Sequence, residues 1–369
     1  MVHVRAWPDH RIQELLGIEV PILLAPMAGA ASTEMAIAVS EAGGLGALAC
    51  AMLTVEQVRQ TLDAFRQVTP QPLNLNFFCH RPATPDPERE RAWQKRLEPY
   101  YQDLGLAPDV PAVKAERAPF DLSMAELVAE CRPEVVSFHF GLPASDLLAR
   151  VKESGAKILS TATTVEEAIW LESHGCDAII AQGLEAGGHR GMFLTRDPAT
   201  QIGTMALVPQ VADAVKVPVI AAGGIADGRG IAAAFALGAA AVQLGTAYLR
   251  CPEATVSALY RQALGSSRDD QTTLTNVFTG RPARSLVNRL VREVGPLSDL
   301  VPEFPLAANS LAPLRACAEE RGSADFSPLW AGQALHLARE LPAGELTRRL
   351  ASEALGLLQA FSKWHSAGS

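Results

Sequence analysis

The residue of this chain whose setting most favours chemistry is His189, which lies in a glycine-rich turn directly after a short apolar run. The run 178–183 has the composition of a buried strand, and Gly187 and Gly188 precede the histidine. Glycine lets the backbone approach a ligand closely, and an imidazole takes up or releases a proton near neutral pH. These features predict that His189 is a catalytic base or a donor to the substrate.

A second histidine, His139, lies near the end of another apolar run, 134–140. The carboxyl ends of parallel strands meet at one edge, so His139 is expected to point toward the same site as His189. We therefore treat it as a second catalytic candidate. The alternative is a core histidine whose ring nitrogens are satisfied by hydrogen bonds within the protein.

Two later strand-like runs each end in residues suited to a phosphate group. One run ends at Gly223-Gly224 and the other at Gly245-Thr246. Without a Cβ atom, backbone N–H groups can reach phosphate oxygens, and the hydroxyl of Thr246 can add a donor. Two such pairs favour a phosphate-bearing cofactor over ordinary tight turns.

Other run ends carry groups suited to a flat heteroaromatic ring. The amides of Asn76 and Gln182 can each donate and accept a hydrogen bond. The backbone at Ala25, Pro26 and Met27 can contact one edge of such a ring. Met27 could instead fill the core, but its place after Pro26 at a strand end favours the rim of a site.

The elements that must position these residues repeat a strand–helix unit. Eight apolar, strand-like runs alternate with helical stretches, and they lie at 21–25, 45–49, 72–78, 134–140, 157–162, 178–182, 218–222 and 240–244. This predicts an α/β fold, a TIM (β/α)8 barrel, in which the two glycine pairs follow strands seven and eight, where phosphates often bind. A doubly wound open sheet is the alternative, but no G-x-G-x-x-G follows the first strand.

Two segments depart from the repeat. A polar, proline-rich stretch at about 80–120 is expected to be an insertion or lid after strand 3. From about Arg250 onward, helices without intervening strands are expected. The predicted organisation is therefore a cofactor-binding barrel over residues 1–250, with residues 251–369 as a C-terminal helical extension packed on it.

Charge and composition exclude several classes of partner. The formal net charge is −8 and no Lys/Arg stripe is present, so neither nucleic acid nor a membrane surface is an expected partner. No apolar run approaches the roughly 20 residues of a membrane span, and the first residues lack the features of a signal peptide. The six cysteines include no C-x-x-C pair. We expect a cytoplasmic protein with reduced thiols and no metal site.

These motifs together resemble the FMN-dependent nitronate monooxygenases (formerly 2-nitropropane dioxygenases), in particular class I. The resemblance rests on the ordered segments 25–29, 76–80, 137–141, 182–191, 222–225, 243–246, 279–284 and 329–333, so it spans essentially the whole chain. Any one segment is moderately specific, whereas the ordered set is highly specific.

The resemblance implies a non-covalently bound FMN and assigns roles to individual residues. His189 matches the family's catalytic histidine, and Gln182, Gly187 and Gly188 match neighbours of the flavin. Contacts on the phosphate side are matched by Gly223, Gly224, Gln243, Leu244, Gly245 and Thr246. Two positions depart from the family's pattern: Leu24 stands where Gln is common and Phe304 where Tyr is common. Both bear on substrate preference and not on FMN binding.

The implied reaction is the oxidation of alkyl nitronates, such as propionate 3-nitronate, by O2 to carbonyl compounds and nitrite. The expected partners are therefore a small nitronate and O2, with the protein a monomer or homodimer. Two alternatives stay open: an NAD(P)H-dependent flavin reductase acting on quinones or enoyl groups, and a flavin-binding protein without turnover.

Overall fold

The computed structural model describes residues 7–107 and 117–366, and its centre is a barrel of eight parallel strands. Their order is β1-β9-β8-β6-β5-β4-β3-β2, and a parallel bridge between Leu23 and Leu45 joins the two ends of the sheet. The strands are β1 (Ile22–Leu24), β2 (Gly46–Ala49), β3 (Leu73–Phe78), β4 (Val135–His139), β5 (Lys157–Ala162), β6 (Ala178–Gln182), β8 (Val219–Ala222) and β9 (Ala241–Leu244). The predicted TIM barrel is confirmed, with all eight strands at the expected places.

Helices surround the barrel, and their starts follow local capping signals. They are α2 (Thr33–Glu41), α3 (Val55–Val68), α5 (Leu122–Cys131), α6 (Ser145–Glu153), α7 (Val165–Ser173), α8 (Thr204–Ala214) and α9 (Gly228–Ala236). Thr54 forms a capping box with Gln57 at the start of α3, and the side chains of Asp121 and Thr164 accept backbone N–H bonds at the starts of α5 and α7. The helix α1 (Arg11–Leu16) contributes Ile12 and Leu16 to the apolar cluster inside the barrel.

The interior of the barrel changes from apolar to polar along the strands. On β4, Val135 belongs to the interior cluster, whereas Val136 packs in the outer cluster beneath the helices. Because side chains alternate between faces, Ser137 and His139 follow Val135 on the inner face. The polar residues therefore collect at the carboxyl ends of the strands, which is where a TIM barrel places its active site.

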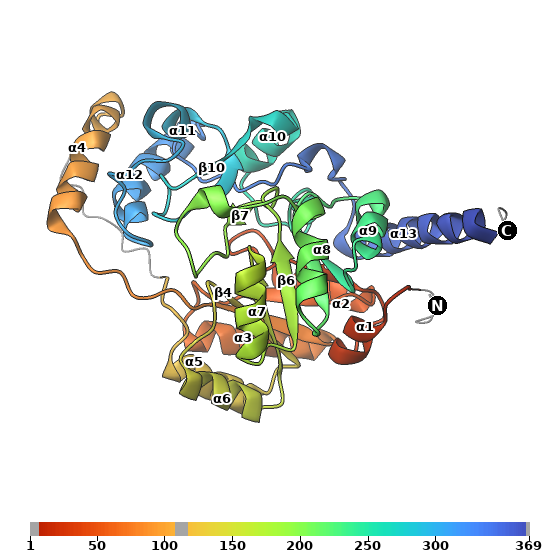
Figure 1. Ribbon diagram of the computed structural model, residues 1–369. Helices are drawn as coiled ribbons and strands as arrows, with labels where there is room; N and C mark the ends of the chain where they lie inside the picture. Colours follow the sequence, from red (N-terminus) through yellow and green to blue (C-terminus); the bar gives the residue numbers. More distant parts are fainter. Residues whose placement is uncertain (1–6, 108–116, 367–369) are drawn as a thin grey trace.

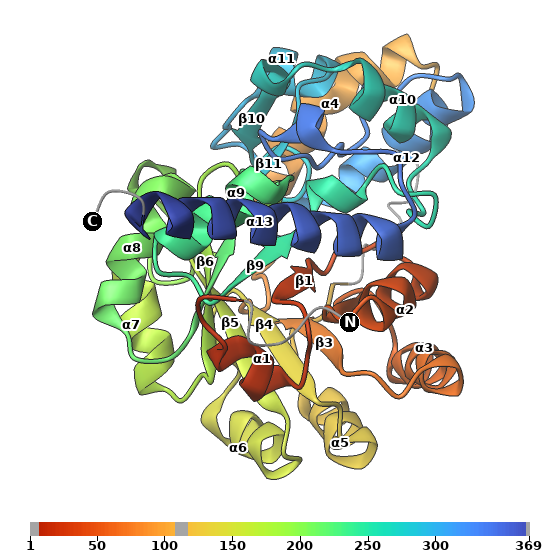
Figure 2. The ribbon, with the colours of Figure 1, turned by 90° about the vertical axis from the view of Figure 1, so that its right-hand side faces the viewer.

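A second layer covers this carboxyl end, and it is built from two distant parts of the chain (Figures 1 and 2). The predicted insertion contains the helix α4 (Pro87–Asp103), and its residues 108–116 lie outside the described part of the chain. The remainder comprises α10 (Ala258–Ser266), β10 (Thr272–Thr275), β11 (Ala283–Leu286), α11 (Arg289–Val294) and α12 (Ala307–Glu320). Trp93 and Leu97 of α4 share one buried cluster with Leu311 and Leu314 of α12.

One expectation about this layer is wrong. The segment after residue 250 was expected to hold helices alone, but β10 and β11 form an antiparallel sheet with a two-residue strand, β7 (Gly188–His189). The strands could not be recognised in the sequence because each is only four residues long, and because the second partner of β11, β7, lies far away in the chain. The extension is therefore joined to the barrel by a sheet as well as by helix packing.

The long helix α13 (Ala343–Ser366) crosses one side of the barrel, next to α2 and α9 (Figure 2). Its residues Leu346, Leu350 and Ala354 join the core beneath the barrel helices. Within the described residues, no helix has the length and apolar character needed to cross a membrane.

Candidate active site

The short strand β7 places His189 between the barrel and the second layer. It follows β6, and its two residues pair with β11, His189 opposite Ala283 and Gly188 opposite Arg284. Gly188 adopts a φ of +72°, which glycine accepts without a steric penalty. The pairing with β11 therefore holds the backbone of the predicted turn, and with it the position of His189.

The imidazole of His189 has one partnered nitrogen and one free nitrogen. Its Nε2 lies 2.9 Å from Oγ1 of the buried Thr279, and its Nδ1 has no hydrogen-bond partner in the described part of the chain. The rings of Phe304 and Trp330 lie 5.4 and 5.2 Å from the imidazole. Burial lowers the pKa of His189 well below 6.5, and the charge of Arg117 lowers it further. His189 is therefore a neutral group at neutral pH.

Both ring nitrogens of His139 are engaged within the protein. Nδ1 lies 3.1 Å from the hydroxyl of Thr161, and Nε2 lies 3.2 Å from the backbone carbonyl of His189. Burial lowers the pKa of His139 to about 4. His139 thus lies beside His189, as the sequence predicts, in a geometry that positions the His189 backbone.

The amide groups expected to face a ring are also used to hold the site together. Gln182 donates from Nε2 to the carbonyl of His189 at 3.0 Å, and its Oε1 accepts from the N–H of Gly191 at 2.8 Å. Asn76 donates from Nδ2 to the hydroxyl of Ser137 at 2.9 Å. Gln182 and Asn76 therefore stabilise the strand ends around the mouth of the barrel.

Arg190, the residue after His189, ties the loop that follows β6 to the end of that strand. Arg190 is fully buried, and its guanidinium donates to the carbonyls of Gln182 and Gly183 at 2.6 and 2.7 Å. Its Nε donates to Oε1 of Gln201 at 2.9 Å. These bonds satisfy carbonyl groups where β6 ends, and they tie the far end of the loop, at residue 201, to the same point.

The predicted phosphate end lies at the ends of β8 and β9. Gly223 and Gly224 have φ angles of +110° and +70°, so both need glycine for the turn itself. The hydroxyl oxygen of Thr246 accepts from the N–H of Gly332 at 2.9 Å, which leaves its hydrogen free to donate. Gly245 faces Met27, whose Sδ would lie 3.5 Å from a Cβ at that position.

The first strand end completes this half of the site. The N–H of Ala25 donates to the carbonyl of Leu244 at 2.8 Å, and the side chain of Leu244 is buried in the outer core, so Leu244 can offer only backbone to a ligand. Pro26 and Met27 are half-buried, as expected for the rim of a site. The Oε1 atom of Gln243 is buried without a hydrogen-bond partner among the described residues. Buried acceptors in proteins are normally hydrogen-bonded, so this oxygen is placed to accept from a donor on a bound group.

Comparison with known proteins decides the family. The family model described as nitronate monooxygenase matches residues 9–353, nearly the whole chain. The chain belongs to the nitronate monooxygenase family. It is 45% identical over 349 residues to a nitronate monooxygenase of Pseudomonas aeruginosa, which covers 94% of this chain and 99% of that protein. Membership of the nitronate monooxygenase family makes the chain an oxidoreductase.

Solved structures agree with this membership. The chain is similar to the nitroalkane oxidase of Streptomyces ansochromogenes, with a TM-score of 0.86 and 38% identity over 95% of this chain and 99% of that chain. It is less similar to FabK of Thermotoga maritima, with a TM-score of 0.73 and 29% identity over 96% and 98% of the two chains. The family and the nitroalkane oxidase together support the oxidation of nitronates.

The two departures from the family's pattern lie in different places. Leu24 is fully buried in the outer core, between the barrel and its helices, so its side chain does not reach the inner face. Phe304 lies at the mouth, with its ring 4.8 Å from His80 and 5.6 Å from Phe140. Of the two, Phe304 alone is placed to act on substrate preference.

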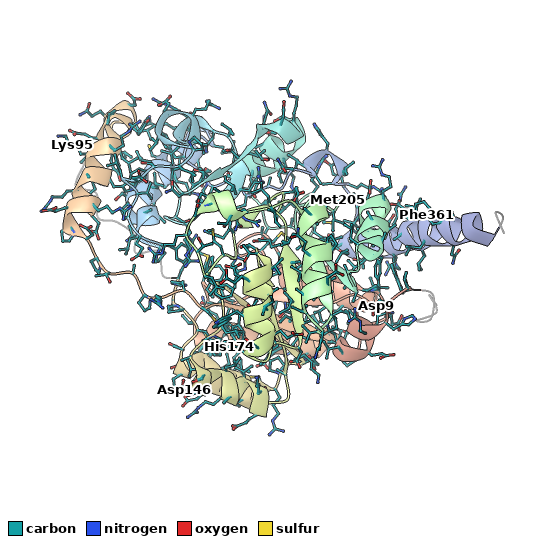
Figure 3. All side chains as sticks on the ribbon, viewed as in Figure 1. Asp9, Lys95, Asp146, His174, Met205 and Phe361 are labelled. Atoms are coloured by element: carbon teal, nitrogen blue, oxygen red, sulfur yellow. The ribbon has the colours of Figure 1, made fainter. Side chains whose placement is uncertain are left out.

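Thr279 and Trp330 are site residues that carry no individual role in the sequence analysis. Thr279 lies between β10 and β11, and Trp330 forms a bridge with Ser285 of β11, which pairs with β7; the sequence offers no local signal for these pairings. His174 is not near this site: it is exposed and lies at the end of α7, on the outside of the barrel (Figure 3). Among the described residues, no group of three or more His, Cys, Asp or Glu could hold a metal ion.

Proposed function

We propose that this chain oxidises alkyl nitronates with O2 to carbonyl compounds and nitrite, using a non-covalently bound FMN. The observation that carries the proposal is the neutral, oriented imidazole of His189 at the mouth of a barrel whose family oxidises nitronates. In this proposal residues 1–250 form the FMN-binding barrel and residues 251–369 form the extension that completes the site.

The residues at the mouth fit a flavin. The orphaned Oε1 of Gln243 would accept from a ring N–H, and the hydrogen of Thr246 would be donated to a phosphate oxygen. At Gly188 a Cβ would meet nothing within 4 Å, which leaves room for a group beside the histidine. The remaining contacts would come from Gly187, Gly223, Gly224 and Gly245 and from the backbone of residues 25–27. When bound, FMN supplies the redox chemistry of the reaction.

The chain's own part in the reaction is to bind and deprotonate the substrate. Thr279 accepts from Nε2–H of His189, which leaves a lone pair on Nδ1. Nδ1 is then able to take the α-proton of a neutral nitroalkane, and the resulting imidazolium attracts the nitronate anion. Gln182 and His139 hold the backbone carbonyl of His189 while the proton moves. The surrounding rings of Phe78, Phe140 and Phe304 exclude water.

The proposal is tested by the absorption spectrum of the purified protein and by nitrite release. We expect flavin bands, free FMN on denaturation, and nitrite from propionate 3-nitronate under air. A colourless protein that cannot be reconstituted with FMN contradicts the cofactor. Addition of NADH without oxygen tests the reductase alternative, because rapid bleaching of the flavin would favour it. Absence of nitrite from every nitronate tried would leave a flavin-binding protein without turnover.

A further inference from the structure

Glu185 carries a half-buried carboxylate that the proposed reaction does not use. It follows β6 and lies in the turn that leads to His189. Its two carboxylate oxygens accept from the backbone N–H of Thr204 at 3.0 and 2.9 Å, and Oε2 also lies 2.8 Å from the hydroxyl of Thr204. The carboxylate is therefore directed at Thr204.

Through these bonds Glu185 caps the helix α8, whose first residue is Thr204. Gly203, in the capping position, has no side chain that could serve as a cap. A helix N-terminus carries unsatisfied N–H groups and a partial positive charge, and a carboxylate stabilises both. A Cβ at Gly203 would lie 2.9 Å from Oε1 of Glu185, so a side chain there would displace the carboxylate.

The same two residues contact the turn after β8 at which a phosphate is expected. The hydroxyl oxygen of Thr204 lies 2.9 Å from the backbone carbonyl of Gly223, so its one hydrogen is shared between this carbonyl and Glu185. A Cβ at Gly224 would lie 3.4 Å from Cβ and 3.7 Å from Cδ of Glu185, so the Glu185 side chain packs against the turn. Glu185 and Thr204 therefore hold the backbone of this turn in place.

The backbone of Glu185 leads to the other phosphate-side turn, which follows β9. Its carbonyl accepts from the N–H of Gln333 at 3.0 Å. The preceding residue, Gly332, donates to the hydroxyl of Thr246 at 2.9 Å. Glu185 thus links the turns after β8 and β9, in each case through one intervening segment.

We propose that Glu185 is a positioning residue that, through Thr204, holds the Gly223–Gly224 turn in the shape that binds the phosphate of FMN. The inference rests on the proposed function, which supplies the FMN, and identifies what shapes the phosphate end of that site. Backbone N–H groups bind a phosphate when they converge on it, so a turn that is free to relax binds it more weakly. Because the carboxylate lies at the positive end of α8, its repulsion of a phosphate is reduced.

The test compares two flavins that differ in the phosphate. FMN carries it and riboflavin lacks it, whereas the ring system is the same. Dilution of the loaded protein releases flavin, whose fluorescence gives each dissociation constant. For Glu185→Ala we expect the Kd of FMN to rise at least about tenfold, the usual effect of losing hydrogen bonds to a charged group, and the Kd of riboflavin to change less than about threefold. Equal losses for the two flavins, or no loss, would overturn the positioning role.

Two milder variants keep the test decisive if Glu185→Ala does not fold. Glu185→Gln keeps an acceptor for the Thr204 N–H but loses the charge, so its Kd for FMN should rise less than that of Glu185→Ala. Thr204→Val removes the hydroxyl that joins the carboxylate to Gly223, so it should weaken FMN binding about three- to tenfold and leave riboflavin binding nearly unchanged. Unchanged FMN affinity in Thr204→Val would contradict the proposed link.

The matched control is Glu172→Ala. Glu172 also accepts from backbone N–H groups, those of Lys216 and Val217 at 2.6 and 3.0 Å, and these residues lie just before β8, at the end opposite the turn. Its replacement should change both dissociation constants by less than about threefold. A selective loss of FMN affinity in this variant would assign the effect to a general distortion around β8 and contradict the role of Glu185.

Nitrite release separates this inference from the proposed function. If Glu185→Ala selectively loses FMN but the FMN-loaded wild type oxidises no nitronate, the proposed function fails and the positioning role stands. If the wild type oxidises nitronates and Glu185→Ala retains FMN equally well, the positioning role fails and the function stands. A wild type that binds FMN no more tightly than riboflavin would show that this turn holds no phosphate, and the inference would fail.

Discussion

The imidazole of His139 hydrogen-bonds the backbone carbonyl of His189, with 3.2 Å between Nε2 and the oxygen. A carbonyl accepts, so Nε2 carries a hydrogen. Burial lowers the pKa of His139 to about 4, so the ring is neutral at neutral pH and its Nδ1 accepts from the hydroxyl of Thr161. The same carbonyl also accepts from Gln182, so the ends of β4 and β6 hold the catalytic candidate together.

Replacement of His139 by Leu should weaken proton abstraction more than nitronate oxidation. The variant loses one of the two hydrogen bonds to the backbone carbonyl of His189, so the imidazole of His189 is held less precisely toward the substrate. We expect kcat with neutral nitroethane to fall about tenfold, the effect of one hydrogen bond, and kcat with ethyl nitronate to fall less. The surface variant His174→Gln is the control. Equal losses with both substrates would contradict a positioning role.

Replacement of His189 by Asn removes the proposed base but keeps a polar side chain of modest size. With neutral nitroethane we expect kcat/KM to fall by about 10²- to 10⁴-fold, the usual contribution of a general base. With preformed ethyl nitronate, which needs no deprotonation, the loss should be much smaller. Steady-state nitrite release from the two substrates measures the difference. Full activity on nitroethane would show that another group takes the proton.

The barrel, and the strand-end residues around its mouth, could be predicted from the sequence. Short apolar runs and capping residues such as Thr54 and Asp121 are local signals, and the elements they predict form as expected. The helix α4 also had a signal, because Trp93, Leu97 and Tyr100 recur at helical spacing behind the cap Asp86. That signal was hidden by the polar composition around it.

The contacts across the second layer could not be predicted in this way. Thr279 reaches His189 through the pairing of β11 with β7, which joins residues about a hundred positions apart. Local sequence signals thus predict the helices and strands, whereas pairing between distant segments determines which side chains share the site.

Mild acid should destabilise the fold through buried histidines. Burial lowers the pKa values of His80 and His139 to about 4, from 6.5 in the free side chain. Below pH 6.5 the unfolded chain therefore binds protons that the folded protein does not. The stability present above pH 6.5 is lost as the pH falls toward 4, by up to roughly 1.4 kcal/mol per pH unit for each histidine.

Urea unfolding at pH 7, 6 and 5 measures this dependence. The free energy of unfolding should fall across the series for the wild type. In His139→Leu the dependence on pH should be shallower, because one of the buried histidines with a lowered pKa (His80, His139 and His189) is gone. An identical dependence in the wild type and this variant would contradict the assignment to His139.

Two adjacent glycines in the turn, Gly187 and Gly188, should be destabilised to different extents by alanine. At Gly187 a Cβ would lie 2.6 Å from the N–H nitrogen of Gly332 and 2.7 Å from the carbonyl carbon of Ala331, both rigid backbone atoms. At Gly188 a Cβ would meet nothing within 4 Å, so the only cost is its φ of +72°. Gly188→Ala should therefore cost about 1 kcal/mol, the usual penalty for a left-handed residue.

Gly187→Ala should cost more, about 1–3 kcal/mol, because the segment 331–332 must move away. That movement stretches the bond from the Gly332 N–H to Thr246, so the variant should also retain less FMN. Thermal unfolding and the flavin content after gel filtration measure the two effects. Gly188→Ala is the matched control for stability, because it adds the same methyl group one residue away. If Gly187→Ala were as stable as Gly188→Ala and held FMN as well as the wild type, the close contact between the turn and the C-terminal segment would not matter for the site.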